Sequence, residues 1–261
     1  LRAKSMQQVK QYLAEIEKNL LDYSGKVKFS NDDFLQRYYN TQLLVAGMKV
    51  PDQRKVFAQG FSFSSLKGKE QLSIWNEVYQ TSNIHEVKSQ ALYFVARIVR
   101  KNENKKELWK TLRHWIQYTD NWAHSDTLSS INALLLEEIP EVVFPQLQKW
   151  NKSGDLWARR QSVVSLLYYH RQRKNFPPYE DMISLVENLL NDEAYYVQKG
   201  VGWTLRELWQ HDAIKTWKFL NQHIHRISAV AFTAAAEKIP LRKKEELKRM
   251  RKNSRADQKQ K

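Results

Sequence analysis

Four residues have the side-chain types needed to stabilise a cation beside a phosphate. Trp122 and Asp126 are four positions apart in a predicted helix, so they lie on one helix face. Arg160 and Trp203 belong to two later helical segments. Two indole faces and a carboxylate favour a cation, and a guanidinium favours a phosphate. If the helices stack in order, these residues could bind an alkylated, positively charged purine nucleotide or the sugar oxocarbenium formed when its base leaves.

A structural interpretation of the same residues stays open. The tryptophans could be core residues, and Asp126 and Arg160 could form an ordinary ion pair, because charge clusters are often only structural. Metal or thiol chemistry is not indicated. The chain has no cysteine, and its seven histidines lack the spacing of a metal site, so we expect no metal and no cofactor.

Residues 191–210 form the most informative predicted helix. An apolar face, formed by Val197, Val201, Leu205 and Leu208, recurs at helical spacing. We expect Asn191 or Asp192 to cap this helix and acidic residues to occupy its first turn.

A second face of this helix carries Lys199, Trp203 and Arg206 at helical spacing. Gly200 and Gly202 lie in the interior of the helix, where each costs about 1 kcal/mol relative to alanine. Such glycines are expected where another group approaches the backbone closely, and a crossing of two packed helices would explain them equally well.

The rest of the sequence also predicts helices, because glycine and proline are few and no long alternating apolar and polar run occurs. The predicted helical ranges are 7–23, 30–38, 51–61, 69–80, 85–100, 105–118, 120–138, 141–150, 155–173, 179–190, 212–223 and 228–238. The fold class is therefore all-α.

The predicted helices come in pairs that repeat. Arg160 and Lys199 occupy matching positions 39 residues apart, close to the period of HEAT and armadillo repeats, and residues 85–92 have a similar pattern. We expect a curved α-solenoid of HEAT-like helical pairs, with residues 1–240 as one domain and residues 241–261 as a basic C-terminal tail. The helices that carry Lys88, Asp126, Arg160 and Lys199 would line a basic concave groove, although such cations can also pair with neighbouring acids.

The charge of the chain favours a polyanionic partner. Lys and Arg total 43 against 28 Asp and Glu, a net charge of +15. No apolar run approaches the length of a membrane span, and the polar N-terminal residues do not resemble a signal peptide. We expect a cytoplasmic monomer whose partner is double-stranded DNA, and a protein-binding scaffold is disfavoured by the charge.

Several stretches resemble the bacterial AlkD-like DNA alkylation repair glycosylases, which are built from HEAT repeats. They are RY at 37–38, GMKVPDQR at 47–54, NWAHSD at 121–126, WARR at 157–160 and QKGVGWTLRE at 198–207. The resemblance spans about residues 34–240. The chain departs from the family pattern before Asp126, at Val45 and Ala46, and in its longer basic tail.

This resemblance implies an N-glycosylase that releases N3- and N7-alkylated purines from double-stranded DNA. Asp126 would be the catalytic carboxylate, and Trp122 and Trp203 would enclose the lesion's deoxyribose. DNA contacts are expected from Arg160, Tyr38, Lys199, Arg206, Arg159 and Lys88. Whether the lesion flips out of the helix or stays stacked is open. The alternative is a non-catalytic HEAT-repeat protein that binds damaged or branched DNA.

Overall fold

The computed structural model describes residues 2–25, 28–168 and 173–259. Over these residues the chain is helical, with isolated bridges between Ser30 and Val45 and between Leu44 and Ile84 but no named strand. The all-α fold class is confirmed. The chain packs as two compact units, Leu1–Ile131 and Asn132–Lys261, and helix α7 (Trp122–Glu138) crosses this boundary. The prediction of one continuous solenoid domain with a basic groove stays a prediction.

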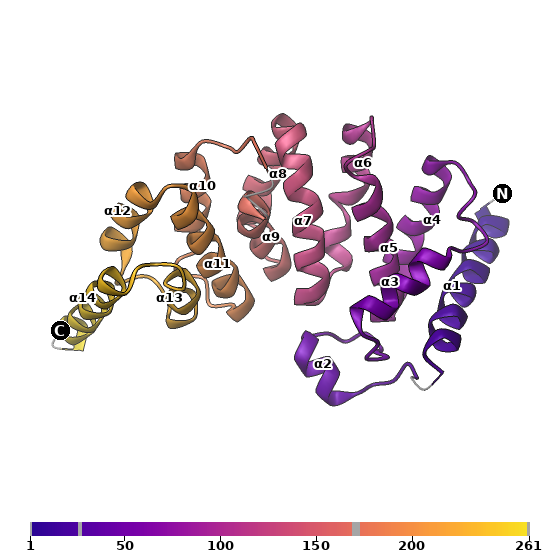
Figure 1. Ribbon diagram of the computed structural model, residues 1–261, viewed down its shortest axis with the longest axis horizontal. Coiled ribbons are helices and arrows are strands. Elements are labelled where there is room, and N and C mark those ends of the chain that lie inside the picture. The colour runs from indigo at the N-terminus through magenta and orange to yellow at the C-terminus, as the bar shows by residue number, and fades with distance from the viewer. Residues whose placement is uncertain (1, 26–27, 169–172, 260–261) are drawn as a thin grey trace. The chain divides into compact units, whose positions relative to one another are not determined.

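The first unit is organised around a buried helix (Figure 1). Every residue of α5 from His85 to Leu92 is buried, because α1, α3 and α4 all pack against it. The helices of this unit before α7 are α1 (Arg2–Ser24), α2 (Asp33–Tyr39), α3 (Val50–Gln59), α4 (Gly68–Thr81), α5 (His85–Ile98), α6 (Lys105–Leu112) and the 3-10 turn η1 (Trp115–Tyr118). The short helix α2 has no buried residue.

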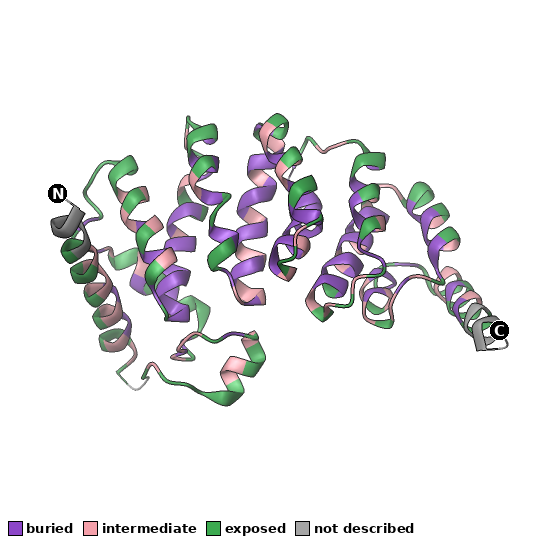
Figure 2. Ribbon diagram, turned by 180° about the vertical axis from the view of Figure 1, so that it is seen from behind, coloured by how far each residue is buried: buried purple, intermediate pink, exposed green. Residues whose placement is uncertain are grey.

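The second unit repeats a pairing of helices. Helices α9, α11 and α13 follow one another as neighbours, with α8 packed on α9, and with α10 and α12 packed on α11. Figure 2 shows the buried residues concentrated on α9 and α11. The helices are α8 (Pro140–Asn151), α9 (Leu156–Leu167), α10 (Tyr179–Asn188), α11 (Tyr195–His211), α12 (Ala213–His223), α13 (Ala229–Ala235) and α14 (Leu241–Lys259).

The start of α11 differs from the prediction. The helix begins at Tyr195, its N-cap is Ala194, and its first turn contains no acid. Asp192 lies before the helix because its carboxylate accepts a hydrogen bond from the Ala194 amide at 2.9 Å and pairs with Arg159 at 2.5 Å. The Gln198 side chain closes the turn by donating to the carbonyls of Leu189 and Asp192, both at 2.8 Å.

Other predicted helices are also shorter than expected, and the 228–238 range gives α13 only from Ala229 to Ala235. The 105–118 range splits into α6 and η1, because the turn between them allows Trp115 to become fully buried, stacked on Tyr79 at 4.2 Å and bonded to Asn76 at 2.8 Å. Helix α9 ends at Leu167 instead of residue 173, and residues 169–172 of the predicted range lie outside the described residues. The Arg173 guanidinium donates to the Leu166 carbonyl at 2.9 Å, near the end of α9.

The glycines of α11 are explained by two different close approaches. A Cβ on Gly202 would lie 2.3 Å from the Ala231 carbonyl oxygen, so the backbones of α11 and α13 are in contact there. A Cβ on Gly200 would lie 3.1 Å from Cγ2 of Val164 and 3.3 Å from both Cγ and Nη1 of Arg160. Gly202 therefore allows a helix crossing, and Gly200 leaves room for the Val164 and Arg160 side chains of α9.

Residues 241–259 of the basic tail belong to the second unit. They form helix α14, from Leu241 to Lys259. Leu247 is fully buried, and the Lys243 ammonium lies over the rings of Trp209 and Trp217 at 5.3 and 4.8 Å. Across the described ranges, α14 included, no helix combines the length and apolar character that a bilayer crossing requires.

Candidate nucleic-acid interface

Trp122, at the start of α7, contacts the exposed helix α2. Its indole Nε1 donates to the Tyr38 carbonyl at 2.7 Å. The indole meets the Tyr38 ring edge-on, with centroids 5.5 Å apart, and stacks on Tyr39 at 5.7 Å. Tyr38 is 55% exposed and Trp122 is partly exposed. The first unit thus brings two of the predicted residues, Tyr38 and Trp122, into direct contact at the surface.

Asp126 lies one helical turn after Trp122 on α7 and is partly exposed. The four-residue spacing puts both side chains on the same helix face, as expected. A carboxylate therefore stands next to an anchored indole, which is an arrangement that attracts a cation.

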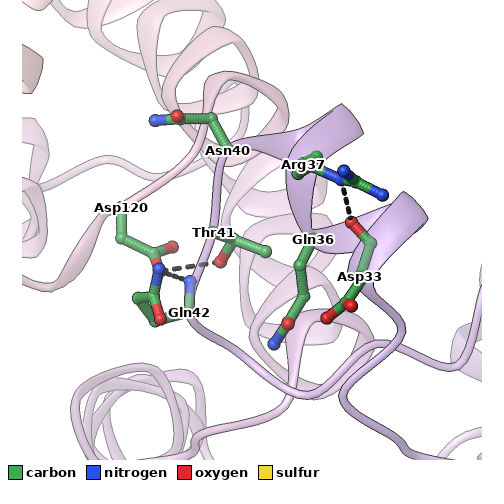
Figure 3. A pocket seen from close by; sticks show the side chains of 7 residues that line it. All are labelled: Asp33, Gln36, Arg37, Asn40, Thr41, Gln42 and Asp120. Atoms are coloured by element: carbon green, nitrogen blue, oxygen red, sulfur yellow. Dashed lines mark hydrogen bonds between the residues drawn. The ribbon is translucent and has the colours of Figure 1, made fainter.

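A second aspartate, just before α7, holds the segment that follows α2. The Asp120 carboxylate accepts hydrogen bonds from the Thr41 hydroxyl at 2.7 Å and the Gln42 amide at 2.9 Å (Figure 3). These residues line an open polar hollow together with Asp33, Gln36, Arg37 and Asn40. No local sequence pattern indicated this role of Asp120, because its partners lie nearly 80 residues earlier in the chain.

Behind Trp122, aromatic and imidazole rings form a continuous stack. Tyr39 stacks on His85 at 4.3 Å, His85 on His124 at 4.3 Å, and His124 contacts Tyr79 at 6.2 Å. His85 and His124 are buried. The stack supports the Trp122 ring from the interior of the unit, which no local sequence pattern indicated.

Both histidines of the stack are neutral at pH 7. Burial lowers the pKa of His85 to about 4, opposed by the charge of Asp120, and burial lowers the pKa of His124 well below its ordinary value. The contacts of His124 agree with this. Its Nδ1 accepts from the Asn121 amide at 2.9 Å, and its Nε2 donates to the His85 carbonyl at 3.1 Å.

Lys88 lies inside the first unit, not on a groove surface. It is 5% exposed, and its ammonium donates to the Tyr118 carbonyl at 2.7 Å. Burial lowers the pKa of Lys88 to about 8, opposed by the nearby Asp120. The sequence placed this cation among the DNA contacts, but the geometry favours a structural role because the ammonium is removed from solvent.

In the second unit, Arg160 is buried against α11. It is 7% exposed, and its Nη1 donates to the Tyr196 carbonyl at 2.7 Å. The side chain lies on the surface left open by Gly200. The guanidinium is therefore held in one position by a neighbouring helix. Lys199, on the same helix as Gly200, is exposed, with its ammonium 5.7 Å from the Tyr195 ring.

Trp203 is partly exposed between a tyrosine and an arginine. Its ring centroid lies 5.1 Å from that of Tyr168, and the Arg206 guanidinium lies 5.6 Å from the indole. Arg206 also pairs with Glu207 at 3.1 Å and with Glu237 at 2.7 Å. These pairs position Arg206 beside Trp203, and any DNA phosphate would have to compete with the two carboxylates for its guanidinium.

Arg159 is similarly occupied. It pairs with Asp192 at 2.5 Å and donates to the carbonyls of Ser153 and Gly154, both at 2.9 Å. Its guanidinium thus ties the start of α9 to the segment before α11, and any DNA contact by Arg159 would have to compete with this pairing.

The predicted residues form two groups, one in each unit. Tyr38, Trp122 and Asp126 belong to the first, and Arg160, Lys199 and Trp203 belong to the second. The convergence of both groups on one nucleotide stays a prediction. Where the structure describes the chain, no cluster of three or more His, Cys, Asp or Glu side chains is placed to hold a metal ion.

The paired helices of the second unit define an all-α, helical-repeat class of protein. The sequence profile of the family described as DNA alkylation repair enzyme matches residues 28–239. Since this match covers most of the chain, the protein belongs to the DNA alkylation repair enzyme family.

Solved structures share this fold. A predicted DNA alkylation repair enzyme from Enterococcus faecalis is 15% identical with a TM-score of 0.65, over 82% of this chain and 99% of its own. AlkD2 from Streptococcus mutans is 18% identical with a TM-score of 0.57, over 88% and 99%. The protein smu.31 from Streptococcus mutans UA159 is 18% identical with a TM-score of 0.56, over 89% and 100%. No curated protein matches the sequence significantly.

Proposed function

We propose that this protein is a DNA N-glycosylase that releases cationic N3- or N7-alkylated purines from double-stranded DNA. The observation that supports it most directly is the pairing of an anchored indole, Trp122, with a carboxylate one turn later, Asp126. A protein that only binds DNA phosphates needs cations, and a carboxylate in its contact surface would weaken binding by repelling the phosphates. In a glycosylase the same carboxylate stabilises the positive charge that develops on the sugar as the cationic base leaves.

The proposed reaction breaks the bond between C1′ and the purine nitrogen. The electron pair leaves with the base, which becomes neutral, so no general acid is required. Positive charge develops at C1′, where the Asp126 carboxylate stabilises it and orients a water molecule for attack. The water oxygen bonds to C1′ and its proton is released. The face of Trp122 stabilises the same charge by cation–π contact.

The neutral histidines behind Trp122 are compatible with this chemistry. A charged imidazolium at that depth would repel the cationic lesion, but burial keeps His85 and His124 unprotonated at pH 7. The exposed Lys199 would contact a phosphate, whereas Arg160, which is 7% exposed and bonded to the Tyr196 carbonyl, would first have to turn towards solvent to do so. We propose a monomer that acts without metal or cofactor.

The test is base release from methylated double-stranded DNA by the wild-type protein and by Asp126→Asn. Binding to the same DNA is measured in parallel. We expect the wild type to release N3- and N7-methylpurines and Asp126→Asn to lose at least about 100-fold in rate, the scale of one electrostatic stabiliser. DNA binding should be retained, because the substitution removes a negative charge.

Asp181→Asn is the matched control, since Asp181 is an exposed aspartate on α10 in the first turn. It should release base at the wild-type rate. A wild type that binds methylated DNA with strong salt dependence but releases no base would contradict the glycosylase and support a non-catalytic DNA-binding protein. A wild type that does not bind DNA at low salt would exclude both.

A further inference from the structure

The C-terminal helix forms a basic hollow with α13 that the functions above do not use. Ala229, Phe232 and Thr233 of α13 and Lys248, Arg251 and Lys252 of α14 line this hollow of about 350 Å³. The family profile ends at residue 239, so the three cations lie beyond the part of the chain that it matches. Both helices belong to the second unit.

The hollow is built on a fixed guanidinium. Arg251 is 8% exposed, lies 4.7 Å from the Phe232 ring and donates to the Ser228 carbonyl at 3.4 Å. Leu247 is fully buried one turn earlier. These contacts hold α14 against α13, so the lysines that flank Arg251 have defined positions.

The cations of α14 fall on two faces. Lys244, Lys248 and Lys252 follow one another at intervals of four residues, so they form a row along the face that borders the hollow. Arg242 and Arg249 lie about a third of a turn away on another exposed face. A pair of cations can therefore be removed from either face of the same helix, which provides an internal comparison.

The chemistry of the lining favours a phosphate. The Thr233 hydroxyl donates to the Ala229 carbonyl at 2.9 Å, so the charged donors of the hollow are the lysines and Arg251. Lys248 pairs with Glu245 at 2.8 Å, but both side chains are about half exposed. Such a surface pair contributes little stability and can exchange for a stronger anion. A phosphate accepts hydrogen bonds from several cations at once.

The place of the hollow in the fold favours a DNA backbone. Helix α13 packs on α11, which carries Lys199 and Trp203, and α11 packs on α9, which carries Arg160. Neighbouring helices are about 8–10 Å apart, so α13 is about 20 Å from the Arg160 helix. A DNA strand advances about 3.4 Å per nucleotide, so this separation corresponds to about six base pairs.

We propose that the hollow between α13 and α14 binds a backbone phosphate of the DNA duplex, about six base pairs along the DNA from the part that lies against α9. The proposal rests on the proposed function only in taking DNA as the partner. It adds a second anchoring point on α14, beyond the residues that the family profile matches.

The experiment compares two double variants of the full chain. Lys248→Ala with Lys252→Ala removes two cations from the hollow, and Arg242→Ala with Arg249→Ala removes two from the other face of α14. Affinity is measured from about 50 to about 200 mM salt, the range over which phosphate contacts are revealed, on a duplex of about 24 base pairs with a central methylated purine. A third variant, Lys248→Arg with Lys252→Arg, keeps the charge, and circular dichroism confirms that each variant is folded.

We expect the lysine-to-alanine pair to weaken binding at least about tenfold and to lower the slope of log affinity against log salt by about 1, the value for one lost phosphate contact. The arginine face should change affinity less than about threefold, and the lysine-to-arginine pair should bind like the wild type. The duplex is then shortened from one end or from the other. The loss of affinity caused by the lysine-to-alanine pair should disappear when the DNA on one side of the methylated purine is removed, and should remain when the DNA on the other side is removed. Equal effects of both faces, or an effect independent of duplex length, would overturn the proposal.

Failure of this proposal can be told apart from failure of the proposed function. Base release by the wild type tests the glycosylase without reference to α14. A wild type that releases no base but shows the lysine-specific loss of binding would refute the enzyme and retain the phosphate site. A wild type that releases base while both α14 faces act alike would do the reverse.

Discussion

At the scale of single residues, Gly200 and Arg160 act together. The glycine leaves the space in which the Arg160 side chain lies along α11, with Cγ and Nη1 each 3.3 Å from where a Cβ would be. The same guanidinium donates to the Tyr196 carbonyl at 2.7 Å. The position of a candidate phosphate-binding cation therefore depends on the absence of a side chain from the next helix.

Gly200→Ala tests this dependence. Alanine gains about 1 kcal/mol of helix propensity, and the contact requires neighbours to move by only a few tenths of an ångström, so stability should change by less than about 1 kcal/mol. Val164 and Arg160 should shift by a few tenths of an ångström, and we expect DNA affinity to fall about twofold to threefold. Thermal unfolding and DNA binding are the two measurements.

Gly202→Ala is the matched comparison. Its Cβ would meet the Ala231 backbone at 2.3–2.9 Å, and a backbone cannot swing aside as a side chain can. We expect a loss of about 1–3 kcal/mol in the free energy of unfolding, typical of overpacking. If Gly200→Ala instead destabilises the protein as much as Gly202→Ala and binds DNA normally, Gly200 serves packing alone.

His85 should make the stability of the protein fall in mild acid. Its pKa is about 4 when folded and 6.5 in the ordinary state, so the unfolded chain binds the proton more tightly. Stability contributed by neutral His85 is complete above pH 6.5 and is lost as the pH falls towards 4. The loss at about pH 5 is about 2 kcal/mol.

His85→Phe tests this linkage. Phenylalanine keeps a ring in the stack and cannot be protonated, and within the described part of the chain neither ring nitrogen of His85 has a hydrogen-bond partner to lose. The free energy of unfolding, measured with urea, should fall between about pH 7 and about pH 5 in both proteins. The fall should be about 2 kcal/mol smaller in His85→Phe than in the wild type. The exposed His225 provides the control, since His225→Phe should leave the wild-type difference unchanged. An unaltered pH dependence in His85→Phe would contradict the assignment.

At the scale of elements, the position of α2 depends on contacts with residues at and just before the start of α7. The helix is seven residues long and buries none of them, so it has little packing energy of its own. Its position depends on the Trp122 indole at the Tyr38 carbonyl and on Asp120 at Thr41 and Gln42. The first residues of α7 and the residues just before it therefore determine where Tyr38 is presented.

Asp120→Ala should loosen this segment. The Gln42 amide loses its acceptor, and we expect hydrogen exchange over residues 33–43 to accelerate at least about tenfold while α5 keeps its protection. Asp33→Ala removes a carboxylate that lines the same hollow without removing these two bonds, and its exchange should stay close to wild type. Unchanged exchange in Asp120→Ala would mean that Trp122 alone suffices.

At the scale of the whole molecule, the net charge of +15 determines how binding responds to salt. Each neutralised phosphate releases counterions, so about six to ten contacts would lower affinity about 10³–10⁵-fold between about 50 and about 200 mM salt. We expect a DNA-binding slope of that size for the wild type. Asp126→Asn should keep the same slope, because a carboxylate does not pair with phosphate. A slope near zero would show that the charge serves solubility instead of DNA.

The amino-acid sequence determined which segments are helical and which surfaces are apolar, because helical periodicity, prolines and scarce glycines are local properties. It also placed Trp122 and Asp126 on one helix face, since that relation needs only the helical repeat. The family followed from motifs spread over most of the chain and is confirmed by the profile match.

Tertiary structure decided which cations are available at the surface. Lys88 is buried and its ammonium donates to the carbonyl of Tyr118, 30 residues later, which the sequence around Lys88 does not reveal. Nor does the local sequence reveal that Arg159 pairs with Asp192, that Gly200 accommodates Arg160, or that Asp120 reaches back to Thr41. Each of these contacts joins residues far apart in the chain, so their energies depend on the packing of whole helices and not on any local pattern.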